Sequence, residues 1–233
     1  MHRKAIAHLR RADPVLASII DRVGPCRFQL RTEGTHFDAV VRSIIYQQLS
    51  GSAASTIHSR VLTLFGGSPH PAQLATVDDT ALRSVGVSRQ KIAYLKDLAA
   101  RVLADEVPIE RLHELEDAAV IDALTRVKGV GTWTAHMFLM FRLGRADVLP
   151  TGDLGIRKAM QRAYRMRRPP DERRMQRVAA CWSPYTSVAC WYLWRSLEQS
   201  AAAAPPKRQG NATPTTRSSR TRARNGRRPR RTR

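Results

Sequence analysis

Apolar residues recur at steps of three and four along most of this 233-residue chain, which is the spacing of one face of an α-helix. Glycine- and proline-containing breaks separate these stretches, at residues 66–69, 86, 108, 129–131, 150–152, 169–170 and 184. No segment alternates between apolar and polar residues in the manner of a strand. The pattern therefore predicts an all-α protein of about ten helices. The apolar stripes are Val15, Leu16, Ile19, Ile20 and Val23; Val40, Val41, Ile44, Ile45 and Leu49; Ile57, Val61, Leu62, Leu64 and Phe65; Ile92, Leu95, Leu98, Ala99, Val102 and Leu103; Val120, Ile121, Leu124 and Val127; and Trp133, Met137, Met140 and Phe141.

Two segments depart from this pattern. Residues 25–34 favour an extended chain, but they are too few to build a sheet domain. The stretch after Ala204 consists of polar residues, proline and glycine, so it cannot offset its ordering entropy and is expected to be disordered. We therefore expect one helical domain over residues 1–200 and a disordered Arg-rich tail over residues 201–233.

The charge is strongly positive and unevenly distributed. The chain has 40 Lys and Arg against 19 Asp and Glu, a formal net charge of +21. Residues 201–233 contain eleven basic residues and no acidic one, which leaves +10 on the rest of the chain. A surplus of this size is better explained by binding to a polyanionic partner than by a contribution to solubility alone.

The cysteines and the ends of the chain exclude several classes of protein. Cys26, Cys181 and Cys190 are scattered, so neither a zinc ribbon nor an iron–sulfur loop has its ligands, and free thiols in a reducing compartment are expected. No apolar run reaches the roughly 20 residues that span a bilayer, and we expect no membrane association. The basic residues 1–11 lack the apolar segment of a signal peptide, although they leave a transit peptide open. Because Asp13-Pro14 is typical of a helix start, we favour an ordinary helical beginning.

The first segment with chemical potential is a glycine turn at residues 127–135. Gly129 and Gly131 allow a tight turn that bares backbone N–H groups at the start of the next helix, where phosphates bind. Lys128 adds positive charge beside the turn. A simple helix–helix turn explains the two glycines equally well.

The second segment carries a single carboxylate. Asp153 lies between Pro150 and the helical run at residues 156–165, where the commonest role of an aspartate is to cap the helix. About twenty residues, which make one helix and a return loop, separate Asp153 from the glycine turn. This spacing lets the turn and the carboxylate lie side by side, and the pair is more informative than either segment alone.

Together these segments resemble the helix-hairpin-helix superfamily of base-excision DNA glycosylases, in which a hairpin is followed by a Gly/Pro-rich loop ending in an aspartate. The resemblance extends over residues 36–195 and is strongest to the 3-methyladenine DNA glycosylase II branch, which residues 44–50 and 182–185 also resemble. It implies two helical subdomains with a DNA-binding cleft between them. Double-stranded DNA with damaged bases is the implied partner, and residues 128–132 (Lys128, Gly129, Val130, Gly131, Thr132) are the implied DNA-binding hairpin.

Two departures from the superfamily pattern narrow the expected activity. Bifunctional members carry a lysine nucleophile where this chain has Trp133, and the iron–sulfur branch needs four clustered cysteines. The resemblance therefore implies a monofunctional glycosylase with no cofactor and no metal cluster. It also allows a monovalent cation at the hairpin carbonyls.

The resemblance assigns Asp153 as the catalytic residue. After the damaged nucleotide is flipped out of the duplex, its carboxylate would stabilise the oxocarbenium-like sugar, orient the attacking water, or both. An N3- or N7-alkylated purine is already cationic and needs no general acid, so the implied substrates are of the 3-methyladenine and 7-methylguanine type. Aromatic rings select such bases by cation–π attraction, worth about 0.5–2 kcal/mol per ring.

Four residues are expected to line the base pocket: Trp133, Tyr185, Tyr46 and Gln48. Core packing is the alternative for the aromatic residues, and we favour it for Trp191 and Trp194. A polar helix end capped by Ser50 is the alternative for Tyr46, Gln47 and Gln48. A third aromatic position of the family falls at Met137, which weakens the expected pocket.

Arg89 falls at the position from which the family inserts a wedge into the hole left by the flipped base. A solvated arginine or a phosphate contact explains it nearly as well. His136 is given no role. We expect a monomer in the cytoplasm or nucleoid, or in the nucleus of a eukaryote.

Two alternative functions remain open at this point. In the first, the chain is a non-catalytic helix-hairpin-helix DNA-binding module in which Asp153 only caps a helix. In the second, it is a glycosylase for other damaged bases, such as oxidised bases or uracil. Release of alkylated bases, measured for the wild type beside an Asp153→Asn variant, distinguishes these alternatives.

Truncation after Ala204 should make the salt dependence of non-specific DNA binding shallower and leave base preference unchanged. Each lost phosphate contact lowers the slope of log K against log salt by about 0.9. Fluorescence anisotropy over a range of salt concentrations measures this slope. An unchanged slope would show that the tail does not contact DNA.

Overall fold

Twelve α-helices and two short 3-10 helices (η1 and η2) form the part of the chain that the computed structural model describes, residues 2–202. This part contains no strand, so the all-α prediction is confirmed, and residues 25–34 form an irregular connection. The elements are α1 His2–Ala12, α2 Pro14–Val23, α3 His36–Tyr46, α4 Gly51–Phe65, α5 Pro71–Thr76, α6 Asp79–Ser84, α7 Arg89–Leu103, η1 Ile109–Glu114, α8 Asp117–Thr125, α9 Thr132–Phe141, α10 Leu154–Ala163, α11 Glu172–Ala179, η2 Ala180–Trp182 and α12 Thr186–Ala202.

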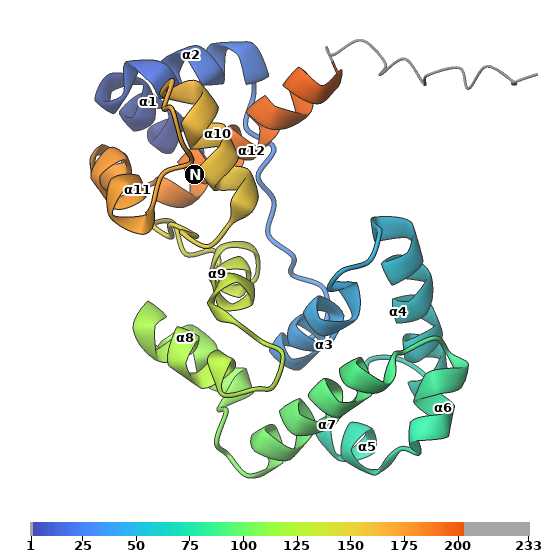
Figure 1. Cartoon of the computed structure of the whole chain (residues 1–233). Coiled ribbons are helices and arrows are strands. Elements are labelled where there is room, and N and C mark those ends of the chain that lie inside the picture. Colours follow the sequence, from blue (N-terminus) through green and yellow to red (C-terminus); the bar gives the residue numbers. More distant parts are fainter. Residues whose placement is uncertain (1, 203–233) are drawn as a thin grey trace, which may run out of the picture.

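The helices form two subdomains built from different parts of the chain (Figure 1). Helices α1 and α2 pack with α10, α11 and α12, so the two ends of the described chain share one subdomain. Helices α3 to α7 and η1 form the other, whereas α9 packs on both α8 and α3. The loop that follows α9 returns the chain to the first subdomain, and this places residues 127–135 and 150–155 near the junction.

Polar caps define where the helices begin. The Asp13 carboxylate accepts hydrogen bonds from the amides of Val15 and Leu16, and Pro14 occupies the first turn of α2, as the sequence predicted. Thr35 and Asp38 form a reciprocal capping box at the start of α3. Such local signals explain why the helix boundaries follow the sequence pattern closely.

The core continues through both subdomains. Its centre in the first subdomain is α12, where residues 188–193 are all buried, including Trp191 and the fully enclosed Tyr192. Trp182 is also fully buried, beneath α1. Burying each large apolar side chain contributes about 1.5–3 kcal/mol. No helix of the described residues combines the length and the apolar character that crossing a bilayer requires.

The helical domain continues to Ala202, two residues past the expected boundary. The tail expected to be disordered begins at residue 201, and residues 203–233 lie outside the described part of the chain.

A buried carboxylate joins three distant elements of the first subdomain. Asp13, only 6 % exposed, accepts hydrogen bonds at Oδ2 from the Tyr164 hydroxyl at 2.5 Å and from Trp182 Nε1 at 2.8 Å. Its Oδ1 caps α2. Burial and the neighbouring carboxylate raise the pKa of Tyr164, so the phenol remains a donor. One side chain thus links α2 to the end of α10 and to η2.

Replacing Asp13 with alanine should destabilise the protein strongly, because it removes the cap and leaves two buried donors without an acceptor. We expect a loss of about 3 kcal/mol in the free energy of unfolding, or roughly 6–12 °C in Tm. Chemical denaturation and calorimetry measure both. The control is Asp21→Ala, which removes an exposed ion pair with Arg10 and should cost less than about 1 kcal/mol. Equal losses in the two variants would contradict the role of the buried network.

Candidate active site

Asp153 caps α10, and its carboxylate is almost fully enclosed. The loop before it turns tightly, with the Asp153 amide donating to the Pro150 carbonyl at 2.9 Å. Oδ1 accepts a hydrogen bond from the Ile156 amide at 2.7 Å. The side chain is 8 % exposed. The capping interpretation of Asp153 is therefore correct, and it fixes where the carboxylate lies.

Two indole N–H groups also donate to this carboxylate. Trp133 Nε1 lies 2.6 Å from Oδ2, and Trp194 Nε1 lies 3.0 Å from Oδ1. Together with the Ile156 amide, these donors hold both oxygens in one orientation. A carboxylate whose oxygens accept hydrogen bonds only from N–H donors is in the arrangement that suits its ionised form. An ionised carboxylate is what the stabilisation of a nearby cation requires. This contact places Trp133, just after the glycine turn, beside the Asp153 carboxylate, as the spacing of the two segments allowed, whereas the catalytic and pocket roles of these residues stay predictions.

Trp194 is a site residue that the sequence analysis assigned to the core. The ring does pack in the interior, where it stacks on Phe141 with ring centroids 5.9 Å apart. Its Nε1 group, however, donates a hydrogen bond to the Asp153 carboxylate, which the core assignment did not anticipate. Trp191, by contrast, is buried as expected. One signal lay in the sequence at Gly155. A Cβ there would lie 3.0 Å from Asp153 Oδ1 and 3.1 Å from the Trp194 ring, so glycine permits the close approach.

The glycine turn connects α8 to α9 with its polar backbone exposed. Gly129 has φ +77°, and the Val130 amide donates to the Val127 carbonyl across the turn. Gly131 is the N-cap of α9 and provides no side-chain cap, so the first amides of the helix face outward. Gly131 and Thr132 are exposed. This arrangement suits a phosphate group.

Val130 plays a different part from its neighbours in the turn. Its side chain is 4 % exposed and belongs to the hydrophobic core. Val130 was expected to contact DNA; with its side chain buried, only its backbone can do so. The side chain instead anchors the turn.

Residues from α7 and α3 hold the turn in place from beneath. Asp97 accepts a hydrogen bond from the Lys128 amide at 2.9 Å, and Gln47 Nε2 donates to the Gly129 carbonyl at 2.8 Å. The Tyr94 ring fills the space below Gly129, where an added Cβ would lie 2.2 Å from it. These three supports were not identified in the sequence, because each comes from a distant helix.

Lys128 is less free than the sequence suggested. Its ammonium lies 3.5 Å from Asp97 Oδ1, and Asp97 also pairs with Arg101. Burial raises the pKa of Asp97, but the Lys128 amide and the Arg101 guanidinium outweigh this effect and hold the pKa below its usual range. Asp97 therefore remains negative and balances part of the Lys128 charge.

The remaining predicted site residues lie on other elements, and the described contacts do not join them to Asp153. Tyr46, at the end of α3, packs under the Arg42 guanidinium at 4.1 Å. Gln48 is exposed and has φ +56°, which is uncommon for a residue other than glycine. Tyr185 is half-buried against the His8 ring, with centroids 5.4 Å apart. Arg89 is exposed in the first turn of α7. Their pocket and wedge roles stay predictions.

No group of three or more His, Cys, Asp or Glu in the described residues could hold a metal ion. The hairpin carbonyls, where a monovalent cation was expected, are partly engaged: Gln47 donates to Gly129 and the Val130 amide donates to Val127. A cation there stays a prediction.

Gly129→Ala and Gly131→Ala form a matched pair that tests how the turn is held. Alanine at 129 meets the Tyr94 ring and a left-handed backbone, so we expect a loss of at least about 1–2 kcal/mol in the free energy of unfolding. Alanine at 131 meets no atom within 4 Å at φ −98° and should cost less than about 1 kcal/mol. Urea denaturation measures both values.

A second comparison isolates the clash. Tyr94→Ala in the Gly129→Ala background removes the ring that the new methyl group meets. The double variant should therefore lose less than the sum of the two single losses. Additive losses would show that the ring does not limit position 129.

Comparisons with known proteins agree with this geometry. Residues 41–184 match the model of the HhH-GPD superfamily base excision DNA repair proteins. DNA-3-methyladenine glycosylase 1 of Schizosaccharomyces pombe is 30 % identical over 197 residues, covering 83 % of this chain and 86 % of that protein. A DNA-3-methyladenine glycosidase structure from Bacillus halodurans is 38 % identical with a TM-score of 0.73, covering 84 % of this chain and 89 % of that one. A structure of 3-methyladenine DNA glycosylase (Mag1) from S. pombe in complex with abasic DNA has a TM-score of 0.71 and 30 % identity, covering 82 % and 95 % of the two chains. The chain belongs to the HhH-GPD superfamily of base excision DNA repair proteins.

Proposed function

We propose that this protein is a monofunctional DNA glycosylase that removes alkylated purines from double-stranded DNA. The observation that carries the proposal is the position of the Asp153 carboxylate. It accepts a 2.6 Å hydrogen bond from the indole of Trp133, which lies on the helix that follows the glycine turn. The names of its relatives, which are DNA-3-methyladenine glycosylases, support the same class of substrate. The bound DNA in one related structure supports DNA as the partner.

The glycine turn holds the duplex while the nucleotide is extruded. The outward amides at the start of α9 bind a backbone phosphate, which places the next nucleotides close to Asp153. Because the turn is fixed by Asp97, Gln47 and Tyr94, this distance is set before DNA arrives. Preorganisation of this kind reduces the entropy lost on reaching the reactive geometry.

Bond cleavage then needs one negative charge. As the C1′–N bond breaks, its electron pair leaves with the base and the sugar becomes an oxocarbenium-like cation. The Asp153 carboxylate stabilises this cation, and water adds at C1′ and releases one proton to solvent, which leaves an abasic site. The departing alkylated base becomes neutral as it accepts the electron pair, so it requires no proton donor. The donors around Asp153 keep the carboxylate oriented throughout.

The exposed face of Trp133 provides a surface for the base. The residue is 47 % exposed although its Nε1 is fixed to Asp153. A cationic purine stacked on this face gains about 0.5–2 kcal/mol over a neutral one. Met137, one helical turn along α9, is half-buried and polarizable, and it supplies apolar contact in place of a second ring.

Two lysines, one in the glycine turn and one that contacts its support Gln47, are engaged elsewhere, which supports base release without strand cleavage. Lys91 Nζ donates to the carbonyls of Ile45 and Gln47 at 2.7 and 2.8 Å, and Lys128 is paired with Asp97. Trp133 occupies the position where lyases of the resembled family carry their amine. Incubation with alkylated duplex and borohydride should therefore trap no protein–DNA adduct on a denaturing gel. A trapped adduct would overturn the monofunctional assignment.

Asp153→Asn should abolish base release, and circular dichroism with a denaturation curve checks that the variant remains folded, because its NH2 group cannot accept the hydrogen bond that Oδ2 accepts from Trp133. Asparagine keeps an acceptor for the Ile156 amide, but it removes the charge, and we expect the single-turnover rate to fall at least about a hundredfold. Release of 3-methyladenine and 7-methylguanine from methylated DNA measures the rate.

The matched control is Asp171→Asn, which makes the same change at the cap of α11, where Oδ1 accepts a hydrogen bond from the Arg174 amide at 2.8 Å. This variant should keep most of the wild-type rate. Full activity of Asp153→Asn would exclude a catalytic role for the carboxylate. Binding of damaged DNA by the wild type with no release of any base would favour the non-catalytic module.

A further inference from the structure

A second basic surface lies at the opposite end of α10 from Asp153. Helices α2, α10 and α12 line an open hollow of about 1040 Å³ in the first subdomain. Asp153 precedes the first residue of α10 and Tyr164 follows its last, so the helix separates the two places by about 15 Å. The hollow is therefore distinct from the site at the glycine turn.

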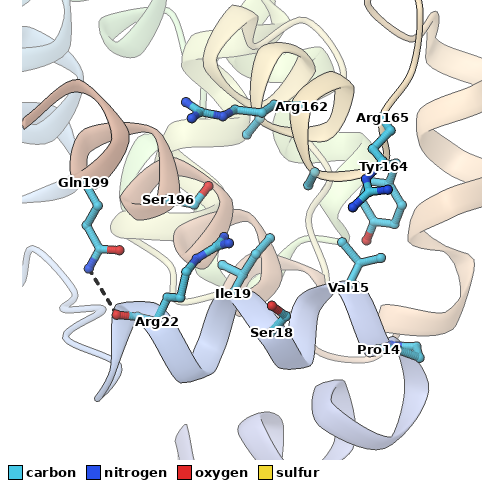
Figure 2. A pocket seen from close by; sticks show the side chains of 12 residues that line it. Pro14, Val15, Ser18, Ile19, Arg22, Arg162, Tyr164, Arg165, Ser196 and Gln199 are labelled. Carbon is cyan, nitrogen blue, oxygen red and sulfur yellow. Dashed lines mark hydrogen bonds between the residues drawn. The ribbon is translucent and has the colours of Figure 1, made fainter. Parts of the chain in front are cut away.

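The hollow has an apolar floor and an arginine rim. Val15, Ile19, Ala159 and Ala163 are among the residues that line it. Figure 2 shows Arg22 extending from α2 into the space below Arg162 of α10, whereas Tyr164 and Arg165 lie at the other end near Val15. The lining contains three arginines, no lysine and no acidic residue.

The arginine surface continues beyond this hollow. A second hollow of about 700 Å³ shares Tyr164 and Arg165 with the first. Its lining adds Arg167, Arg168 and Arg174, with Asp171 as its one acidic residue. Asp171 already accepts a hydrogen bond from the Arg174 amide as the cap of α11. Among the described residues, none of the six arginines has an acidic side chain within ion-pair distance, although seven such pairs involve arginines elsewhere.

The centre of this surface is the turn that ends α10. Arg165 has φ +49°, the left-handed conformation in which many helices end, and the amides of Arg165 and Met166 donate to the carbonyls of Arg162 and Gln161. This turn places Arg165 where the two hollows meet.

We propose that the arginine-lined hollows between α2, α10 and α12 bind the sugar–phosphate backbone of a second DNA segment. Arginine has the planar donors that match phosphate oxygens, and the exclusive use of arginine fits this ligand. The apolar floor suits the carbon atoms of deoxyribose. The inference does not depend on which base the enzyme removes.

Positive charge argues against two other ligands for the hollows, the tail of the same chain and a second copy of the protein. The tail follows α12 only a few residues after Gln199, which lines the hollow, but it contains eleven basic residues and no acidic one. A second copy of a chain with net charge +21 would also be repelled. An acidic segment of another protein shares the required charge, and the experiment below includes it as an alternative.

The test counts how many duplexes the full-length protein binds. Titration with an undamaged duplex of about 12 base pairs, roughly one helical turn, should show two duplexes per wild-type protein at low salt. The Arg162→Gln/Arg165→Gln variant should bind the second duplex roughly tenfold or more weakly, because each lost phosphate contact lowers log K and its salt slope. Release of alkylated bases should stay at the wild-type rate, so failure of the glycosylase proposal is visible separately.

The matched control is Arg3→Gln/Lys4→Gln, which removes two exposed charges from α1, neither of which lines the hollows. This variant should bind the second duplex within about twofold of the wild type, since net charge alone acts weakly once screened. A single-stranded oligothymidine of the same length shows whether one strand suffices. Binding of only one duplex by the wild type, or equal weakening in both variants, would overturn the proposal. Preferential occupation of the hollows by a poly-glutamate peptide would also overturn it, in favour of an acidic protein partner.

Discussion

The hydrogen bond between Trp133 and Asp153 is the interaction on which the candidate active site depends. It joins the first turn of α9 to the N-cap of α10, with Trp133 Nε1 2.6 Å from Asp153 Oδ2. The residue just after the glycine turn is thereby fixed to the carboxylate. A carboxylate that only capped α10 would need no indole donors. The two added donors, Trp133 and Trp194, restrict the rotation of the carboxylate by holding one oxygen each. The proposed catalytic role of Asp153 and its observed capping role therefore follow from one arrangement.

The glycine turn, which we propose binds DNA, depends in the same way on side chains behind it. A glycine-rich turn has many accessible conformations, and binding a phosphate would have to select one of them. Here Asp97, Gln47 and Tyr94 make that selection in advance, through two hydrogen bonds to the backbone and one ring in contact with it. The negative charge of Asp97 is tolerable near a phosphate because Lys128 and Arg101 pair with it.

Whether the sequence predicted a contact depends on how far apart the contacting residues lie along the chain. Helix boundaries and caps such as Asp13 and Asp153 depend on neighbouring residues, so local patterns predict them. The partners Trp194 and Asp97 lie 41 and 31 residues from the atoms that they contact, and nothing in their own helices distinguishes them from core or surface residues. Val130 illustrates the opposite error, since its place in a functional motif concealed a core side chain. Gly155 was the one local sign of a long-range contact, because a glycine early in a helix requires a reason.

Helix α10 has the Asp153 carboxylate at one end and the arginine-lined hollows at the other, and both charges lie at the end that the helix dipole favours. The amino-terminal end of a helix stabilises negative charge and the carboxyl-terminal end stabilises positive charge. Asp153 lies at the first end, and Arg162 and Arg165 lie at the second. The dipole explains why positive charge is tolerated there, but its effect is limited to the last turn and to fractions of a kcal/mol. It does not account for Arg22 on α2 or Arg174 on α11, which face the same hollows from other helices. Convergence of arginines from three elements is what a shared anionic ligand explains and a helix dipole does not.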